Sequence, residues 1–144
     1  MNDPVVEVHC MYDTLGSPVD INGVAMFRFQ NGAMGTVSLA GNVPQFGSNI
    51  QIMSDQMLII TDQYGTKLEM KRGDKTIYPH VEQEIHAPAA GTPHRNFLRA
   101  IQGKEPLRAP ARYGVLLSAL MDAMYTSAKK RQPVEVQPVP DEID

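Results

Sequence analysis

The feature that most constrains the fold is an Asn-Gly pair between two runs of strand-forming residues. Asn31-Gly32 separates residues 21–29 from residues 34–39, and both runs are rich in apolar side chains. Asn-Gly is the strongest short-range signal of a β-hairpin, because a type I′ turn requires positive φ at both central positions. A two-residue loop centred on this pair fixes which side chains share a face of the hairpin.

The predicted register gives the hairpin two apolar faces. One face carries Ala25, Phe27, Phe29, Met34, Thr36 and Ser38, and the other carries Val24, Met26, Arg28, Gly35, Val37 and Leu39. An antiparallel pair commonly leaves one face to water. We therefore expect helices of the same chain to cover one face, and a second copy of the chain, another domain or a ligand to cover the other.

The remaining sequence predicts further strands, then two helices and a last strand. Strand-like runs occupy residues 4–11, 49–53, 57–61, 66–71, 75–78 and 134–136. Thr92-Pro93 and Gly103 are residue types that begin and end a helix, and apolar side chains recur at helical spacing over residues 112–130. This order predicts an α+β domain over residues 4–136, a mostly antiparallel open β-sheet with two helices packed on one face. Residues 137–144 form an acidic tail that we expect to be frayed.

Length and charge exclude several classes of protein. The 144 residues suffice for one domain, and a net charge of -3 argues against nucleic acid or an anionic membrane as partner, since both favour basic surfaces. No secretory leader or apolar span is recognisable, so we expect a cytoplasmic protein. Cys10 is the only cysteine, which excludes an internal disulfide. Its neighbour His9 would point to the opposite face of a strand, so a buried thiol is expected rather than a catalytic pair.

The sequence lacks the common motifs of nucleotide and metal chemistry. It contains no Gly-x-Gly-x-x-Gly, so no cofactor site is expected in this chain. Three histidines and two glutamates in and beside a proline-containing segment could supply metal ligands: His80, Glu82, Glu84, His86 and His94. Their spacing matches no structural zinc pattern, and exposed loop residues are the expected alternative.

Three consecutive residues are candidates for binding a ligand. His94, Arg95 and Asn96 fall in the first turn of the short predicted helix, where free backbone N–H groups favour anions. Arg95 adds a guanidinium that can hold an anionic or hydroxyl-rich ligand, while solvated residues near a helix cap are the alternative. Arg28 is the one charge on its hairpin face, and it either pairs with an acid across an interface or marks the edge of a polar pocket.

Several segments together resemble the Gfo/Idh/MocA oxidoreductases. Residues 19–36 resemble a characteristic hairpin of that family, with an acid-led strand, an aromatic, Asn-Gly-Ala and Gly-Thr. Residues 94–106 look like its short helix ending in a Gly-x-x-Pro turn, and residues 114–134 are similar to its long terminal helix and final strand. The resemblance covers residues 4–136. One departure is the turn at residues 54–57, where relatives usually carry glycines.

The resemblance implies a domain separated from its catalytic partner. Full-length members begin with a Rossmann domain that binds NAD(P) and carries a Glu-Lys-Pro lysine, and a following helix carries an Asp and a His. None of these matches a residue here. The chain would be the substrate-binding and dimerisation domain of an NAD(P)-dependent sugar- or polyol-type dehydrogenase, with no catalytic residue and no activity by itself. Hydride would pass between nicotinamide C4 and a hydroxyl-bearing carbon only in the complete enzyme.

The resemblance also assigns surfaces to this chain. The open sheet face would form a homo-oligomer, and the residues expected there are Val24, Met26, Arg28, Val37 and Leu39. His94, Arg95 and Asn96 would belong to the substrate pocket. Two other functions remain open from the sequence. One is a free-standing interaction module that self-associates without catalysis, and the other is a small metal-dependent or cofactor-free enzyme built on the histidines.

Overall fold

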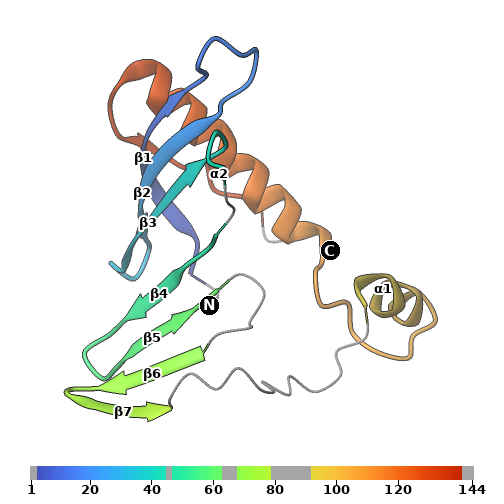
Figure 1. Cartoon of the computed structure of the whole chain (residues 1–144). Helices are drawn as coiled ribbons and strands as arrows, with labels where there is room; N and C mark the ends of the chain where they lie inside the picture. Colours follow the sequence, from blue (N-terminus) through green and yellow to red (C-terminus); the bar gives the residue numbers. More distant parts are fainter. Residues whose placement is uncertain (1–2, 45–46, 63–67, 79–91, 141–144) are drawn as a thin grey trace. The chain divides into compact units, whose positions relative to one another are not determined.

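In the computed structural model the chain forms two units, and the structure describes residues 3–44, 47–62, 68–78 and 92–140. The first unit comprises Met1–Val43 and Arg99–Asp144, and the second comprises Pro44–Leu98. Figure 1 shows a sheet with a long helix in the first and a sheet of short strands in the second. The α+β class predicted from the sequence is confirmed, with the strands hydrogen-bonded into two separate sheets.

The sheet of the first unit has the strand order β3-β2-β1-β8, and every pair is antiparallel. Its strands are β1 (Val5–Asp13), β2 (Asn22–Phe29), β3 (Met34–Ala40) and β8 (Val134–Glu135). Helix α2 (Ala111–Lys130) packs across β1 and β8. The helix ends at Arg131, which has left-handed backbone with φ 55, and Pro133 follows shortly after.

The core of this unit is small and lies between β1, β2 and α2. Val8, Cys10, Ala25 and Ala123 are its buried apolar residues. Alternation along β1 directs Val8 and Cys10 toward α2, so the residues between them face the other side of the sheet. The helix therefore covers one face and leaves the opposite face, which we call the open face, without cover from the described residues of this unit.

The register of the β2–β3 hairpin differs by one residue from the predicted one. Arg28 lies opposite Met34 and Ala25 opposite Val37, where the two-residue loop predicted Phe29 opposite Met34. The loop has three residues instead: the Phe29 N–H donates to the Ala33 carbonyl at 2.8 Å, and only Gly32 of the pair has positive φ, 87°. A three-residue loop of this kind needs one residue with left-handed backbone at its end, and Gly32 provides it. A glycine at this position is therefore compatible with both the three-residue loop and the type I′ turn.

The changed register corrects the predicted interface. Val37 lies opposite Ala25 and Leu39 opposite Gly23, which places both on the same face of the sheet as α2. They were predicted to share a face with Met26 and Arg28, and that prediction is wrong because a one-residue shift moves every side chain of a strand to the other face. Val37 and Leu39 are still 37% and 52% exposed, since α2 packs on β1 and β8 rather than on β3.

The sheet of the second unit is a meander of four short antiparallel strands. They are β4 (Ile50–Met53), β5 (Leu58–Thr61), β6 (Leu68–Arg72) and β7 (Lys75–Tyr78), in that spatial order. The β4–β5 turn contains no glycine. Ser54 stabilises it instead, because its Oγ accepts the backbone N–H groups of Gln56 and Met57, both at 3.1 Å.

Helix α1 (Pro93–Ile101) begins and ends as the sequence predicts. The Thr92 Oγ1 accepts the Arg95 N–H at 3.3 Å, and Gly103, with φ 67, follows the last turn. Its expected packed stripe is exposed, however: Phe97, Leu98 and Ile101 are 55%, 58% and 69% exposed. The sequence predicts two helices packed on one face of the sheet, and of the two helices described, α2 has this packing.

Candidate functional site

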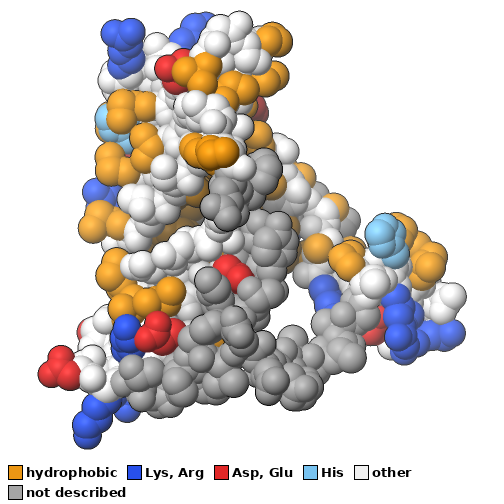
Figure 2. All heavy atoms as spheres, in the orientation of Figure 1, with side chains coloured by type: hydrophobic (Ala, Val, Ile, Leu, Met, Phe, Trp, Pro, Cys, Tyr) orange, Lys and Arg blue, Asp and Glu red, His pale blue; other side chains and the backbone are white. Residues whose placement is uncertain are grey.

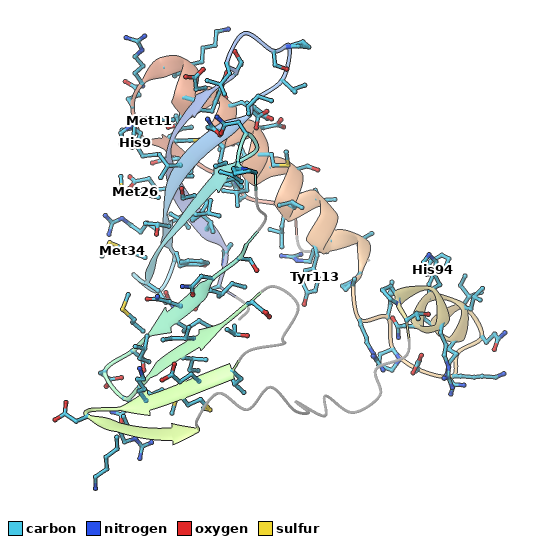
Figure 3. The ribbon with its side chains drawn as sticks, viewed as in Figure 1. His9, Met11, Met26, Met34, His94 and Tyr113 are labelled. Atoms are coloured by element: carbon cyan, nitrogen blue, oxygen red, sulfur yellow. The ribbon has the colours of Figure 1, made fainter. Side chains whose placement is uncertain are left out.

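The open face carries an apolar surface flanked by one ion pair. Its side chains come from all three long strands: half-buried His9 and exposed Met11 from β1, Val24, Met26 and Arg28 from β2, and Met34 from β3. Met11, Met26 and Met34 are 63%, 53% and 76% exposed. Figure 3 shows the labelled methionines and His9 projecting away from α2, and Figure 2 shows hydrophobic side chains along the same side. This surface suits a protein partner better than water.

Arg28 has a partner within its own sheet. Its Nε lies 3.4 Å from Oε1 of Glu7, its cross-strand neighbour, and both side chains are about half exposed. Neither alternative raised by the sequence, an acid across an interface or the edge of a polar pocket, is needed to account for the charge. An exposed pair of this kind contributes little to stability, about 0–1 kcal/mol.

The three candidate ligand-binding residues point in different directions. His94, Arg95 and Asn96 are consecutive in α1, so their side chains leave the helix about 100° apart. Asn96 is 5% exposed, whereas His94 and Arg95 are exposed. The structure therefore does not bring the three together as one ligand-binding set.

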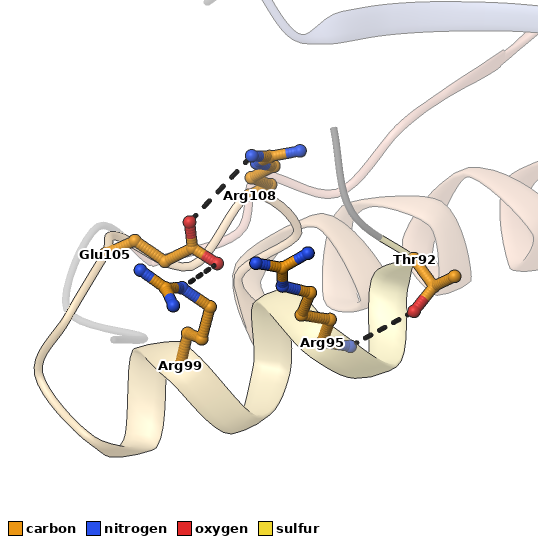
Figure 4. Close-up of polar contacts among 5 residues, drawn as sticks. All are labelled: Thr92, Arg95, Arg99, Glu105 and Arg108. Carbon is orange, nitrogen blue, oxygen red and sulfur yellow. Dashed lines mark hydrogen bonds and ion pairs between the residues drawn. The ribbon is translucent and has the colours of Figure 1, made fainter. Parts of the chain in front are cut away.

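Arginines of α1 and of the loop after it share one carboxylate. Glu105 Oε1 lies 3.5 Å from Nε of Arg99, and its Oε2 lies 3.9 Å from Nη2 of Arg108 (Figure 4). Arg95 precedes Arg99 by four residues and lies on the same side of α1. Sequence reasoning selected Arg95 alone, although the four-residue spacing to Arg99 was a signal for the pair.

A hollow of about 580 Å³ lies within the first unit, beside α2. Most of its lining is aliphatic and comes from the start of β1, the first half of α2 and the segment after β8. Of its polar residues, Asp3 accepts a hydrogen bond from Asn31 at 2.6 Å and Arg112 donates to the Pro140 carbonyl at 2.9 Å. A volume of this size can hold a small ligand, but its walls suit apolar groups rather than sugar hydroxyls.

The thiol of Cys10 is buried and unreactive, as the sequence predicts. It is 4% exposed, and burial raises its pKa above the ordinary value, with a further increase from the charge of Asp20. A thiol with a raised pKa holds its proton and is a poor nucleophile. Among the residues that the structure describes, no three His, Cys, Asp or Glu side chains are grouped to hold a metal ion. His80, Glu82, Glu84 and His86 lie outside the described residues.

Two residues of α2, Tyr125 and Ser127, make long-range contacts with β1 and with the β1–β2 connection, and sequence reasoning missed both residues. Tyr125 Oη donates to Asp20 Oδ1 at 2.7 Å, and its ring meets Tyr12 edge-on at a centroid distance of 5.6 Å. Ser127 is fully buried and accepts the Cys10 N–H at 3.0 Å. The partners are more than 100 residues apart in the chain, so no local pattern links them.

We expect the Tyr125–Asp20 contact to make stability fall at alkaline pH. The hydrogen bond to Asp20, and then its negative charge, raise the pKa of Tyr125 above 10.0. The unfolded tyrosine ionises first, so this stabilisation is complete below about pH 10 and is lost as the pH rises through the higher folded pKa. Absorbance at 295 nm should show one tyrosine ionising late, and Tyr125→Phe should remove that step.

Asp20→Asn serves as the control for this contact, because it keeps an acceptor for the phenol and removes the charge. It should lower the pKa of Tyr125 toward its ordinary value. Urea unfolding at pH 9 and pH 11 should show a smaller loss of stability for Tyr125→Phe than for the unaltered protein. Equal losses for the two proteins would contradict the assignment.

No described helix is both long enough and apolar enough to cross a membrane. The sequence matches no protein-family model. No curated protein sequence matches it either. Comparison with solved structures, in contrast, gives matches over almost the whole chain.

Three solved structures illustrate the shared fold. The WlbA dehydrogenase from Bordetella pertussis, in complex with NADH and UDP-GlcNAcA, matches 95% of this chain with a TM-score of 0.71 and 19% identity. A levoglucosan dehydrogenase in complex with NADH and L-sorbose matches 94% with a TM-score of 0.72 and 22% identity. An NAD-binding protein from Listeria innocua matches 94% with a TM-score of 0.72 and 14% identity.

The matches extend over less than half of each neighbour. This chain covers 43% of the WlbA dehydrogenase, 46% of the levoglucosan dehydrogenase and 46% of the Listeria protein. At these identities the likeness shows a common fold. The chain thus has the fold of one part of larger proteins that include NAD-dependent dehydrogenases.

Proposed function

We propose that this chain is the substrate-binding and dimerisation domain of a sugar or polyol dehydrogenase of the Gfo/Idh/MocA type. The observation that carries the proposal is the partial match: 94% of this chain corresponds to 46% of a levoglucosan dehydrogenase. The segments that resemble the family also fall on matching elements. Residues 19–36 include β2 and the start of β3, residues 94–106 include most of α1, and residues 114–128 lie in α2.

The residues of this chain do not fit a dinucleotide cofactor. NAD(P) is bound by a glycine-rich turn between a parallel strand and a helix, and the strand pairs described here are all antiparallel. The sequence also contains no Gly-x-Gly-x-x-Gly. Under the proposal another part of a longer protein binds the cofactor, and the chain studied alone has no dehydrogenase activity.

The proposed substrate class follows from the neighbours and from α1. The matched dehydrogenases are named in complexes with a nucleotide sugar acid and with a ketose, so hydroxyl-rich ligands are common to both. Exposed His94 and Arg95 offer a ring nitrogen and a guanidinium to such a ligand. Asn96 was a third candidate, and its burial supports a role in holding the helix rather than in direct contact with the ligand.

The proposed dimer forms through the open face. Val24, Met26 and Arg28 stay in this interface, and Met11 and Met34 join them on the same side of the sheet. Exposed methionines support this role, since their flexible apolar side chains adapt to a partner surface. Val37 and Leu39 are no longer part of the proposed interface because they lie on the other face.

A free-standing interaction module is the alternative, and the same open face favours it. Reading the genomic DNA upstream of the Met1 codon separates the two functions. We expect an in-frame sequence with a glycine-rich dinucleotide loop and a Glu-Lys-Pro lysine. A stop codon with a ribosome-binding site at that position would overturn the dehydrogenase assignment. Turnover of NADH or NADPH by the purified 144-residue protein would contradict the proposed inactivity.

A further inference from the structure

The chain contains two Asn-Gly pairs, and the fold gives them different surroundings. Asn22-Gly23 begins β2, which pairs with β1 on one side and with β3 on the other, and both residues are half-buried. Asn31-Gly32 lies in the loop between β2 and β3, and both residues are exposed. A β-carbon placed on Gly23 would lie 3.5 Å from Leu39 Cδ1, whereas one placed on Gly32 would meet nothing within 4 Å. The same dipeptide is therefore enclosed at one position and accessible at the other.

We propose that Asn31 is a site of spontaneous deamidation in the folded protein, and that the fold protects Asn22 from the same reaction. The backbone nitrogen of Gly32 loses its proton to solvent and attacks Cγ of Asn31, ammonia leaves, and a five-membered succinimide ring forms. Water then opens the ring at either carbonyl, which yields aspartate or isoaspartate at position 31. One amide and one water thus become one carboxylate and one ammonium ion, without oxidation or reduction. A following glycine favours the attack, because it has no side chain to obstruct it and a wide range of backbone angles.

Three hydrogen bonds restrain the reacting groups of the loop. The Gly32 N–H donates to the Phe29 carbonyl at 2.9 Å. Asn31 Oδ1 accepts the Ala33 N–H at 2.9 Å, and Asn31 Nδ2 donates to Asp3 Oδ2 at 2.6 Å. The two bonds of the Asn31 side chain are exposed to water, where a hydrogen bond makes only a modest net contribution to stability. Exposed loops open at a much lower free energy than paired strands, so the attack on Asn31 does not require unfolding of the sheet.

The same attack at Asn22 requires a much larger opening. Asn22 lies opposite Asp13 on one side and Ala40 on the other, and its Oδ1 accepts the Gly41 N–H at 3.2 Å. Backbone hydrogen bonds continue beyond it: the Ile21 N–H donates to the Asp13 carbonyl at 2.9 Å, and the Ile21 carbonyl accepts the Gly41 N–H at 2.8 Å. Freeing this pair means separating β2 from both neighbouring strands, an opening close to unfolding of the unit.

Deamidation of Asn31 acts on the start of β1. The product has a carboxylate in place of the amide that donates to Asp3, so a hydrogen bond is replaced by repulsion between two like charges. Asp3 and Pro4 line the hollow of about 580 Å³ beside α2, and the Pro4 carbonyl accepts the Gln30 N–H at 3.0 Å. The reaction therefore loosens the segment that forms one wall of this hollow.

The rates at the two pairs can be measured in one sample of the full 144-residue protein, incubated in mildly alkaline buffer with and without urea. Trypsin cleaves after Arg28, so the peptide of residues 1–28 carries Asn22 and the next peptide carries Asn31. Mass spectrometry then follows the change from amide to acid at each residue. In the folded protein we expect Asn31 to react on the order of tenfold faster than Asn22, the effect of about 1.4 kcal/mol in opening free energy. In urea the two rates should be similar. Equal rates in the folded protein, or a faster reaction at Asn22, would overturn the proposal.

Asp3→Ala tests the restraint on the Asn31 side chain. It removes the acceptor of Asn31 Nδ2, so the reaction of Asn31 should become severalfold faster in the folded protein and stay unchanged in urea. Asp55→Ala is the matched control, because it also removes an exposed carboxylate that accepts a side-chain amide, here that of Gln56 in the β4–β5 turn. It should leave the rate at Asn31 unaltered. The same rate in both variants would show that Asp3 does not restrain the reaction.

Asn31→Asp imitates the aspartate product and tests its effect on β1. Hydrogen exchange at the Gln30 N–H should become faster, since its acceptor Pro4 belongs to the loosened segment. Adding Asp3→Asn exchanges the donor and the acceptor and removes the repulsion, so the double variant should exchange as slowly as the unaltered protein. Equally fast exchange in the single and the double variant would contradict the proposed effect on the start of β1.

Discussion

Replacing Met26 with lysine is expected to convert the protein from a dimer into a monomer. Met26 lies on the middle strand of the three long ones, opposite His9 on one side and Thr36 on the other. It is 53% exposed in the single chain and would be buried in a dimer formed through the open face. A two-fold interface contains each of its residues twice, so the variant would bury two unpaired ammonium groups.

The expected loss in free energy of association is larger than the contribution of an ordinary interface contact. A buried charge without a partner costs several kcal/mol, and the loss occurs in both subunits. Sedimentation or light scattering should show a mass of twice 15.9 kDa for the unaltered protein and 15.9 kDa for Met26→Lys. A monomeric unaltered protein would contradict the proposed dimer directly.

Leu39→Lys is the matched control for this experiment. Leu39 is 52% exposed, close to the 53% of Met26, and belongs to the same hairpin, but it faces the side of the sheet that carries α2. We expect Leu39→Lys to remain a dimer. If the Leu39→Lys dimer dissociates and the Met26→Lys dimer does not, the interface lies on the opposite face of the sheet. The predicted two-residue loop places both residues on one face and would not distinguish these two outcomes.

The hairpin shows which part of the fold local sequence determines. The strand-forming runs around Asn31-Gly32 were identified to within one residue of β2 and β3. The loop length was wrong, because Asn-Gly satisfies both a two-residue and a three-residue turn. The three-residue loop contains a side-chain contact, in which Asn31 Oδ1 accepts the Ala33 N–H at 2.9 Å. A pattern of apolar and polar residues does not contain that information.

The candidate site was harder to predict than the fold. His94, Arg95 and Asn96 were selected because they are adjacent in a first helical turn, but adjacency on a helix separates side chains rather than gathering them. The contacts that gather side chains here join a helix to the loop after it, as for Arg99 with Glu105, or join neighbouring strands, as for Arg28 with Glu7. A contact between residues as distant in sequence as Cys10 and Ser127 can be identified only in the folded chain.

Replacing Ser127 with alanine should destabilise the first unit by about 2 kcal/mol, the usual cost of a buried backbone group left without a partner. Val8 lies opposite Val134, so regular pairing would bring Cys10 opposite Gln132. The Ser127 hydroxyl takes the place of that pair: it accepts the Cys10 N–H at 3.0 Å and donates to the Gln132 carbonyl at 2.7 Å. Removing it leaves the Cys10 N–H unpaired beside the core.

The effect is measurable because the core is so small and the hydroxyl has no exposed surface. Urea unfolding gives the free energy of each variant. Ser118→Ala is the matched control, since Ser118 is on the same helix and its hydroxyl also donates to a backbone carbonyl, that of Gly114, but it is exposed. Alanine favours a helix over serine by several tenths of a kcal/mol, so Ser118→Ala should be neutral or slightly stabilising. If both variants unfold at the same urea concentration, the hydroxyl between β1 and Gln132 contributes nothing, and the end of the sheet is held by α2 packing alone.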